Sequence, residues 1–191
     1  MKEQLNNVIS IVDIIIEKFV EEGFTCLDAT VGNGNDTIKL SGKVGESGRV
    51  YGFDIQKTAI EITTEKLSKY GYIDRTILIN DSHTKLDDYI KEQLDFAIYN
   101  LGFLPKGRKE IVTNEKTTIE SIKKALNLLK KHGILVVVSY IGHENGLDEY
   151  KAVYKYLSLL DQKNFNVLEL NFINQINNPP RLFCVEVRGG K

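Results

Sequence analysis

The stretch Leu27-Asp-Ala-Thr-Val-Gly-Asn-Gly-Asn-Asp-Thr37 decides the fold of this chain. It begins as the end of an apolar strand, predicted over 25–30, and passes directly into a turn that contains Gly32 and Gly34. Glycines at such a turn let the backbone reverse tightly and approach a ligand closely. Because Asn35 or Asp36 can cap a helix, we predict that a helix follows at once. A strand, a glycine turn and a helix in this order predict the nucleotide end of a parallel α/β sheet.

The same turn indicates which nucleotide ligand it accepts. A dinucleotide fingerprint has a third glycine, and Thr37 stands near that position instead. With Asp36 near the helix start, a carboxylate would repel a pyrophosphate, whereas it would attract a sulfonium ligand that also carries an ammonium group. Asp28 is the natural partner of that ammonium, directly or through water. The turn therefore predicts S-adenosyl-L-methionine as the cofactor.

Two further acidic strand ends complete the predicted nucleoside site. Asp54 ends the second strand about twenty residues beyond the glycines, where a carboxylate accepts both ribose hydroxyls. Asp81 follows the third strand and can accept the adenine amino group, while a backbone N–H reaches a ring nitrogen. His83 either contacts the ligand or packs at the start of the next helix. Three such features in chain order predict an adenosyl site.

Outward from this centre, strand-like and helix-like segments alternate along the chain. This alternation predicts one α/β domain, 1–191, with a doubly wound, mostly parallel seven-stranded sheet of the Rossmann-like type. No helix-length segment separates the last two strands, so we expect an antiparallel hairpin at the sheet edge. The N-terminal helix, within 1–22, is expected to pack on the sheet or to pair subunits. Helices are predicted over 5–22, 36–41, 57–70, 84–93, 115–131 and 148–160, and strands over 25–30, 48–54, 76–80, 94–100, 134–140, 164–172 and 182–187.

The end of the fourth strand is the predicted reacting end of the site. In open α/β sheets, ligands lie beyond the carboxyl ends of the strands, and Asn100-Leu-Gly-Phe-Leu-Pro105 follows this one. An amine that accepts a methyl group must lose a proton, aim its lone pair and be kept from water. The Asn100 side chain and nearby carbonyls can hold the N–H groups. Phe103 either walls the site or stacks on a base, or the segment is simply a turn with a buried aromatic side chain.

The loop after the fifth strand reaches the same edge of the sheet. Tyr140 can orient a substrate, and His143 with Glu144 can serve as a proton acceptor, unless this is a solvated loop before a helix. Basic side chains near this edge can contact a few phosphates. They are Lys106, Arg108, Lys109 and Arg181.

Composition limits the classes of partner. The formal net charge of −1 gives no support for extended duplex binding, although a local patch could still grip a small RNA. No apolar run is long enough to span a membrane, and the two cysteines lie in apolar strand-like runs rather than in a disulfide or metal framework. We therefore expect a cytoplasmic protein without a metal, and a homodimer because symmetric dimers are the commonest assemblies.

Several motifs, taken in chain order, are similar to those of the YtqB/MnmM family, long labelled rRNA methylases. The similarity spans roughly 5–187, nearly the whole chain. The motifs that carry it are Asp28-Ala-Thr-Val-Gly-Asn-Gly-Asn-Asp-Thr37, Gly52-Phe-Asp-Ile-Gln56, Asp81-Ser-His83, Asn100-Leu-Gly-Phe-Leu-Pro105, Gly142-His143, Phe172-Ile-Asn-Gln175 and Asn178-Pro-Pro180.

This resemblance implies a class I methyltransferase that methylates the aminomethyl group of 5-aminomethyl-2-thiouridine at the tRNA wobble position, U34. The implied partner is the anticodon stem-loop. Together, residues and resemblance predict catalytic roles for Asn100, Tyr140 and His143. The predicted cofactor residues are Asp28, Thr30, Gly32, Asn33, Gly34, Asn35, Asp36, Thr37, Asp54, Gln56, Asp81, Ser82, His83 and Asn100. The predicted substrate residues are Phe103, Lys106, Arg108, Lys109, Gln175, Asn178 and Arg181.

Two loops depart from the family pattern. Similar sequences read Leu-Pro-Gly-Gly-Asp-Lys where this one reads Leu104-Pro-Lys-Gly-Arg-Lys109, and Tyr-Pro-Gly-His-x-Gly-Gly where it reads Tyr140-Ile-Gly-His-Glu-Asn-Gly146. Both loops lie at the substrate edge, so they bear on the RNA substrate rather than on methyl transfer. Ribosomal RNA and a small-molecule amine remain open as substrates. A nicotinamide oxidoreductase and a cofactor-binding scaffold without activity are the alternatives outside this enzyme class.

Overall fold

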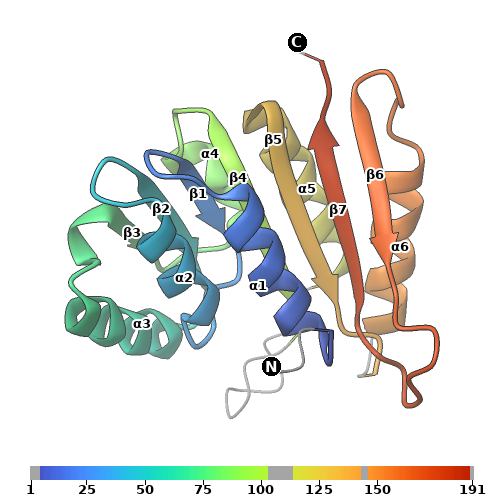
Figure 1. The fold of residues 1–191 in the computed structure, drawn as a ribbon, viewed down its shortest axis with the longest axis horizontal. Helices are drawn as coiled ribbons and strands as arrows, with labels where there is room; N and C mark the ends of the chain where they lie inside the picture. The colour runs from blue at the N-terminus through green and yellow to red at the C-terminus, as the bar shows by residue number, and fades with distance from the viewer. Residues whose placement is uncertain (1–4, 103–113, 143–145, 190–191) are drawn as a thin grey trace.

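The computed structural model describes residues 5–102, 114–142 and 146–189. Its centre is a seven-stranded sheet with the order β3-β2-β1-β4-β5-β7-β6 (Figure 1). The strands from β3 to β5 are parallel, whereas β7 runs antiparallel to β5 and β6. The predicted doubly wound sheet with a terminal antiparallel hairpin is confirmed. The strands are β1 (Thr25–Asp28), β2 (Arg49–Phe53), β3 (Thr76–Ile79), β4 (Leu94–Leu101), β5 (Leu129–Ser139), β6 (Phe165–Leu170) and β7 (Arg181–Val187).

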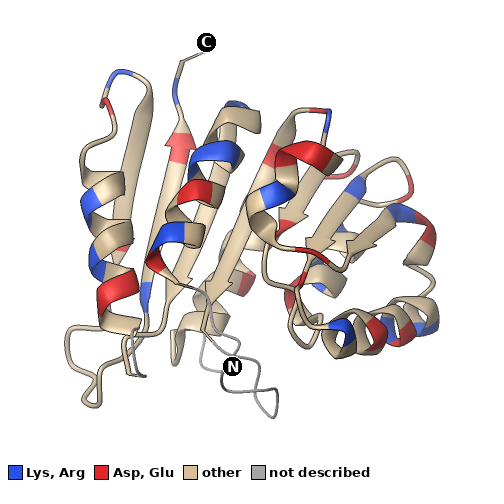
Figure 2. Ribbon diagram, turned by 180° about the vertical axis from the view of Figure 1, so that it is seen from behind, with Lys and Arg blue, Asp and Glu red and all other residues tan. Residues whose placement is uncertain are grey.

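Helices cover both faces of this sheet and form two separate cores. On one face, α1 (Val8–Phe19) and α2 (Asn35–Lys43) pack on side chains of the central strands such as Phe96 and Val136. On the other, α4 (Leu86–Tyr89), α5 (Glu115–Leu128) and α6 (Gly146–Ser158) pack on the alternate side chains, such as Tyr99 and Phe183 (Figure 2). The remaining helix, α3 (Lys57–Tyr70), contacts α2 and β3. The central strands are therefore buried on both sides, as their apolar runs require.

The first part of β5 was predicted wrongly as the end of a helix. The helix expected over 115–131 stops at Leu128, and the chain enters β5 at Leu129, which pairs with Leu94. Pairing with β4 then shifts register and resumes at Ile134, while His132 adopts a left-handed φ of 67°. Lys130 forms an ion pair of 2.7 Å with Asp95. Lys130 and Lys131 favour a helix by their intrinsic propensity, but strand pairing and the ion pair of Lys130 place them in β5.

Other boundaries differ by a few residues or by helix type. The N-terminal helix begins at Val8, because the Asn7 side chain caps it by accepting a hydrogen bond from the Ser10 N–H. The helix predicted over 84–93 is a 3₁₀ turn, η2 (His83–Lys85), followed by the short α4; a second 3₁₀ turn, η1 (Ile73–Arg75), precedes β3. The strand predicted over 164–172 ends at Leu170. The N-terminal helix packs on the sheet as expected.

Cys26 is buried and Cys184 half-buried, and both are free thiols. Within the described ranges, no helix is long and apolar enough to cross a membrane. Nor do those ranges contain a cluster of three or more side chains that could hold a metal ion.

Candidate nucleoside and substrate site

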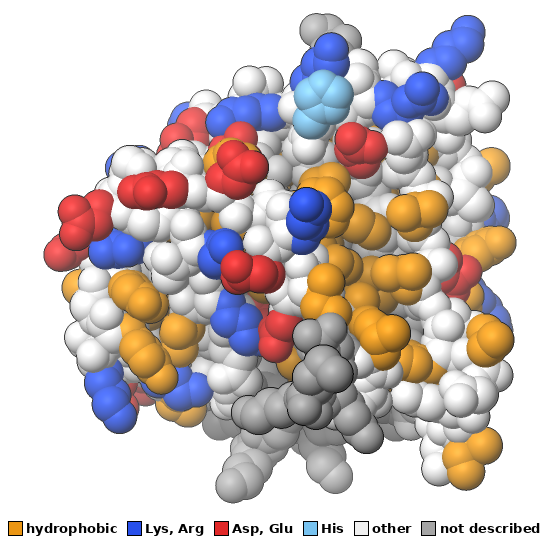
Figure 3. All heavy atoms as spheres, viewed as in Figure 1, with side chains coloured by type: hydrophobic (Ala, Val, Ile, Leu, Met, Phe, Trp, Pro, Cys, Tyr) orange, Lys and Arg blue, Asp and Glu red, His pale blue; other side chains and the backbone are white. Residues whose placement is uncertain are grey.

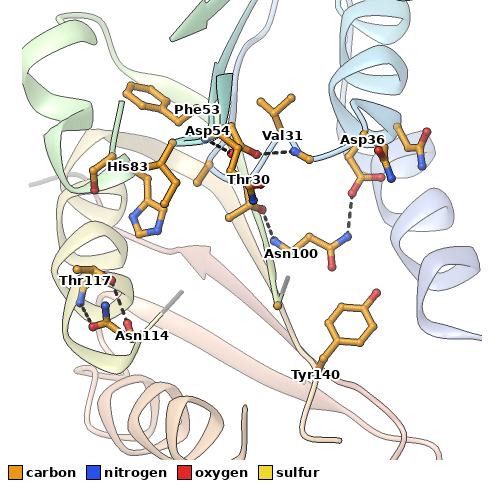
Figure 4. A pocket seen from close by; sticks show the side chains of 18 of the residues that line it. Thr30, Val31, Asp36, Phe53, Asp54, His83, Asn100, Asn114, Thr117 and Tyr140 are labelled. Atoms are coloured by element: carbon orange, nitrogen blue, oxygen red, sulfur yellow. Dashed lines mark hydrogen bonds between the residues drawn. The ribbon is translucent and has the colours of Figure 1, made fainter. Parts of the chain in front are cut away.

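The ends of the parallel strands surround a cavity of about 590 Å³ (Figure 4). Its size suits a ligand as large as a nucleoside with a side chain. Its walls come from the segments that follow the strands, including the first turns of α2 and α5. The described lining residues are Ala29, Thr30, Val31, Gly32, Asn33, Asn35, Asp36, Phe53, Asp54, Ile55, Gln56, Asp81, Ser82, His83, Asn100, Gly102, Asn114, Thr117, Tyr140, Gly142, Asn178 and Pro180.

The glycine turn between β1 and α2 is built by two left-handed residues. Gly32 has a φ of 53° and lines the cavity, while Gly34 has a φ of 75° and caps α2. The cap is therefore Gly34, and the prediction that Asn35 or Asp36 provides it was wrong; both lie in the first helical turn. A Cβ on Gly34 would stand 2.4 Å from the Thr63 hydroxyl oxygen. Gly34 thus allows α2 and α3 to approach closely and does not line the cavity.

Asp28 supports this turn from behind the cavity wall. It is almost completely buried, and its carboxylate accepts hydrogen bonds from the Thr30 N–H (3.1 Å) and the Thr37 hydroxyl (2.6 Å). Burial, and next the charge of Asp36, raise the pKa of Asp28 to about 7. Neither Asp28 nor the fully buried Thr37 lines the cavity. The structure therefore does not place Asp28 for the direct contact with a ligand ammonium that was expected as one of two possibilities; Asp28 supports the loop that lines the cavity.

Asp54, predicted from sequence to bind the ribose, connects the glycine turn to the loop that follows β2. One carboxylate oxygen accepts the Gly32 N–H at 2.8 Å, and the other accepts the Gln56 N–H at 2.8 Å. Burial raises the pKa of Asp54 above its usual value, although these two backbone hydrogen bonds act in the opposite direction. Each oxygen has a second lone pair, so the carboxylate can still accept ribose hydroxyls from the cavity. The side chain is thus held in place before any ligand binds.

The segment after β3 brings two different groups to the cavity. Asp81 accepts hydrogen bonds from Lys85, the Ser82 N–H and Tyr89, which together hold its pKa below the usual value. His83 is 9% exposed, and burial lowers its pKa to about 4, so the imidazole is neutral near pH 7. Its Nδ1 atom has no hydrogen-bond partner among the described residues. The His83 residue lines the cavity, but this nitrogen is itself buried, so a ligand would reach it only after a small shift of the ring.

The reacting end is formed where β4 and β5 finish. The Asn100 N–H donates to the Thr30 hydroxyl at 2.7 Å, which fixes the backbone of this turn. The Asn100 side-chain amide donates to an Asp36 carboxylate oxygen at 3.2 Å. Tyr140 points its hydroxyl toward this pair (Figure 4), and burial followed by the charge of Asp36 raises the pKa of Tyr140. The three side chains therefore converge on one end of the cavity.

The sequence missed a wall contributed by the start of α5. Asn114 caps this helix by accepting the Lys116 and Thr117 N–H groups, both at 3.2 Å. Asn114 and Thr117 line the cavity below His83 (Figure 4). An Asn followed by Glu115 before an amphipathic run is a helix-start signal, so the helix was predictable. Its approach to the strand ends was not, because that depends on tertiary packing.

The substrate residues predicted from sequence divide into three groups. Asn178 lines the cavity, whereas Gln175 instead donates to the Asn6 carbonyl at 3.2 Å. Arg181 does not line the cavity either, so the structure does not bring these two residues to the site. The remaining predicted residues lie outside the described residues: Phe103, Lys106, Arg108, Lys109 and His143.

Comparison with known proteins agrees with this geometry. A family model described as "Putative rRNA methylase" matches residues 50–186. This chain belongs to that family. A solved "putative rRNA-methylase" of Clostridium thermocellum is 45% identical, with a TM-score of 0.94 over 97% of this chain and 100% of its own. A solved "putative methyltransferase" of Streptococcus mutans in complex with SAH is 34% identical, with a TM-score of 0.86 over 98% and 99% of the two chains.

A plant relative carries a named activity. The chloroplastic tRNA (mnm5s2U34)-methyltransferase of Arabidopsis thaliana is 34% identical over 180 residues, which is 89% of this chain. The chain spans 66% of that relative's length. The predicted family and class I fold are confirmed, and a methyltransferase that uses S-adenosylmethionine is confirmed at the level of the family.

Proposed function

We propose that this protein transfers a methyl group from S-adenosylmethionine to the primary amine of 5-aminomethyl-2-thiouridine at the wobble position of tRNA. The observation that carries the proposal is the convergence of Asp36, Asn100 and Tyr140 at one end of a nucleoside-sized cavity. Oxygen acceptors at this position can hold the N–H groups of an amine. The named activity of the Arabidopsis relative supports the same substrate.

The residues present fit the cofactor. Asp54 would hold the ribose hydroxyls, the Asp81 carboxylate would accept the adenine amino group, and Gly32 would let the backbone approach the amino-acid part. None of the described lining residues is Lys or Arg, so the cavity favours a cationic ligand over a pyrophosphate. When bound, S-adenosylmethionine supplies an electrophilic methyl group on a sulfonium. The protein's part is to orient the amine toward it and to exclude water.

The proposed RNA partner is the anticodon stem-loop, which we expect to contact the protein over a small area. Seen from behind, α5 and α6 carry interspersed acidic and basic side chains rather than a basic face (Figure 2). Lys124 pairs with Asp87 at 2.8 Å and with Glu120 at 3.5 Å, so it is already neutralised. Together with the net charge of −1, this supports contact with a few phosphates only.

We further propose a cytoplasmic location and a homodimer. The free thiols of Cys26 and Cys184 suit a reducing compartment. For the dimer, an apolar strip is exposed on the face of β6 and β7 that α1 leaves uncovered (Figure 3). Leu168 and Leu170 are 62% and 44% exposed there, and they pair with Cys184 and Leu182 of β7. A contiguous apolar strip of this kind supports association.

Purified protein and synthetic anticodon stem-loops test the enzymatic proposal. One stem-loop carries 5-aminomethyl-2-thiouridine at the wobble position, and the control carries unmodified uridine. With S-adenosylmethionine present, mass spectrometry should show the methylaminomethyl nucleoside from the first RNA alone. Methylation of ribosomal RNA or of free small amines, with no product on the modified stem-loop, would replace the proposed substrate by one of those classes.

A further inference from the structure

Asp36 stands apart from the other acidic residues of the cavity because it faces the reacting end. One carboxylate oxygen accepts the Asn100 amide at 3.2 Å, and the other faces Lys39 at 3.3 Å. Its side chain is only 12% exposed, and the residue lines the cavity. Asp54 and Asp81, in contrast, follow β2 and β3, on the opposite side of β1 from β4 (Figure 1).

The charge of Asp36 is only partly compensated. Lys39 is shared, since it also forms a short ion pair with Asp13, so these three side chains together carry one net negative charge. Among the described lining residues no Lys or Arg supplies a second cation. A cation that enters this end of the cavity would therefore be attracted.

Asn100 supplies a second acceptor at the same point. Its amide nitrogen is committed to Asp36, and no described residue donates to its side-chain oxygen. The Tyr140 hydroxyl is directed toward the same space (Figure 4). A primary ammonium has three N–H donors, and these three oxygens match them in number. A hydroxymethyl group has the same size but offers one donor and no charge.

We propose that Asp36 binds the substrate's ammonium group and accepts the proton that this group must lose before methyl transfer. The inference rests on the proposed function and adds to it the residue that selects a primary amine. In the transfer, one N–H bond of the ammonium breaks and one O–H bond forms on Asp36, which leaves a neutral carboxyl group and a neutral amine. Rotation of the amine about its C–N bond then turns the lone pair from Asp36 toward the methyl carbon. When substrate covers the site and excludes water, this neutral pair is favoured over the buried ion pair.

The test uses Asp36→Asn, which keeps the shape of the side chain and removes its charge. We would measure affinity for S-adenosylhomocysteine by calorimetry. In its presence, we would then measure affinity for stem-loops carrying either 5-aminomethyl- or 5-hydroxymethyl-2-thiouridine. Wild-type protein should prefer the aminomethyl RNA by about tenfold or more, as expected for a charge-assisted contact. Asp36→Asn should lose this preference and nearly all turnover, with affinity for S-adenosylhomocysteine within about threefold of wild type.

Two further variants keep the result interpretable. Glu17→Gln removes the carboxylate partner of Lys43 at an exposed position of α1, outside the Asp36–Lys39–Asp13 group, and should change neither binding nor turnover. Asp36→Glu keeps the charge and should retain part of the preference. The proposal is overturned if Asp36→Asn keeps the wild-type preference. It is also overturned if the affinity of Asp36→Asn for S-adenosylhomocysteine falls by about tenfold while its preference for the aminomethyl RNA survives. Asp36 would then bind the ammonium group of the cofactor. Failure of wild-type protein to methylate the aminomethyl RNA would instead count against the proposed function.

Discussion

At the scale of single residues, the acidic side chains of the site differ in their burial and in the groups that already bind their oxygens. Asp28 is buried behind the turn it supports, Asp54 is held by two backbone N–H groups but opens into the cavity, and Asp36 contacts Asn100. The sequence placed Asp54 and Asn100 at strand ends because the alternation of strands and helices fixes those ends. It could not separate Asp28 from the ligand, because hydrogen bonds with Thr37 depend on the helical geometry that follows.

Asp54 is predicted to carry much of the cofactor affinity. In Asp54→Asn, the amide loses the charge that strengthens each ribose hydrogen bond and can no longer accept both the Gly32 and Gln56 N–H groups. Charge-assisted hydrogen bonds contribute roughly 1.5–3 kcal/mol each, so the dissociation constant for S-adenosylhomocysteine should rise by about tenfold or more. Calorimetry measures this, with exposed Asp74→Asn as the control. Wild-type affinity in Asp54→Asn would show that the ribose lies elsewhere.

Asp28 is predicted to make stability fall as pH rises. Its pKa is about 7 in the folded state and about 3.9 in an unfolded chain. Between these values the folded protein keeps a proton that the unfolded chain has lost, so the free energy of unfolding decreases with increasing pH. Asp28→Asn has no proton to lose. Its stability relative to wild type should therefore be higher at about pH 8 than at about pH 5, by at least about 1.4 kcal/mol.

Urea denaturation at the two pH values measures this difference. Asp74→Asn changes an exposed carboxylate and should show no comparable pH dependence relative to wild type. Equal stability differences for Asp28→Asn at both pH values would show that Asp28 is ionised throughout in the folded protein.

At the scale of elements, strong sequence patterns predicted the correct type of element. Weaker patterns gave the wrong type where pairing between strands decides the structure. The β-branched run at the centre of β5 was found, but its first residues were assigned to the preceding helix. Only the pairing of Leu129 with Leu94 and the contact of Lys130 with Asp95 reveal that strand. Likewise, the start of α5 at Glu115 was predicted, while its place beside the cavity follows from packing that one sequence does not display.

Gly34 is predicted to be required for the packing of α2 on α3. In Gly34→Ala, the left-handed backbone costs about 1–2 kcal/mol, and the new Cβ meets Thr63. Thermal or urea unfolding should show a loss larger than the backbone cost alone. The double variant Gly34→Ala with Thr63→Ala should recover the part that comes from the clash. A double variant no more stable than Gly34→Ala would show that contact with Thr63 plays no part.

At the scale of the whole molecule, the candidate cofactor site and the exposed apolar strip are separate. The loops of the site lie at the carboxyl ends of the parallel strands, whereas the exposed apolar strip lies on the face of the terminal hairpin (Figures 1 and 3). Alternating segments in the sequence predicted the hairpin. Its uncovered face could not be predicted, because that depends on where α1 crosses the sheet.

If this strip pairs two copies, Leu168→Lys should turn a dimer into a monomer. The substitution places a charge on an apolar surface where Leu168 is 62% exposed, so the chain itself should still fold. Light scattering after size exclusion should give twice the mass of one chain for wild type and the mass of one chain for the variant. Leu159→Lys, at an apolar side chain 75% exposed beyond α6, is the matched control. A wild-type monomer at all concentrations would contradict the homodimer.

The most direct test of the account is a crystal structure with S-adenosylhomocysteine and a stem-loop that carries 5-aminomethyl-2-thiouridine. The account predicts ribose hydroxyls on Asp54, the adenine amino group at Asp81, and the thioether sulfur facing the aminomethyl nitrogen, which lies between Asp36 and Asn100. An adenosyl group outside this cavity, or a wobble base bound with its aminomethyl nitrogen away from Asn100, would contradict it.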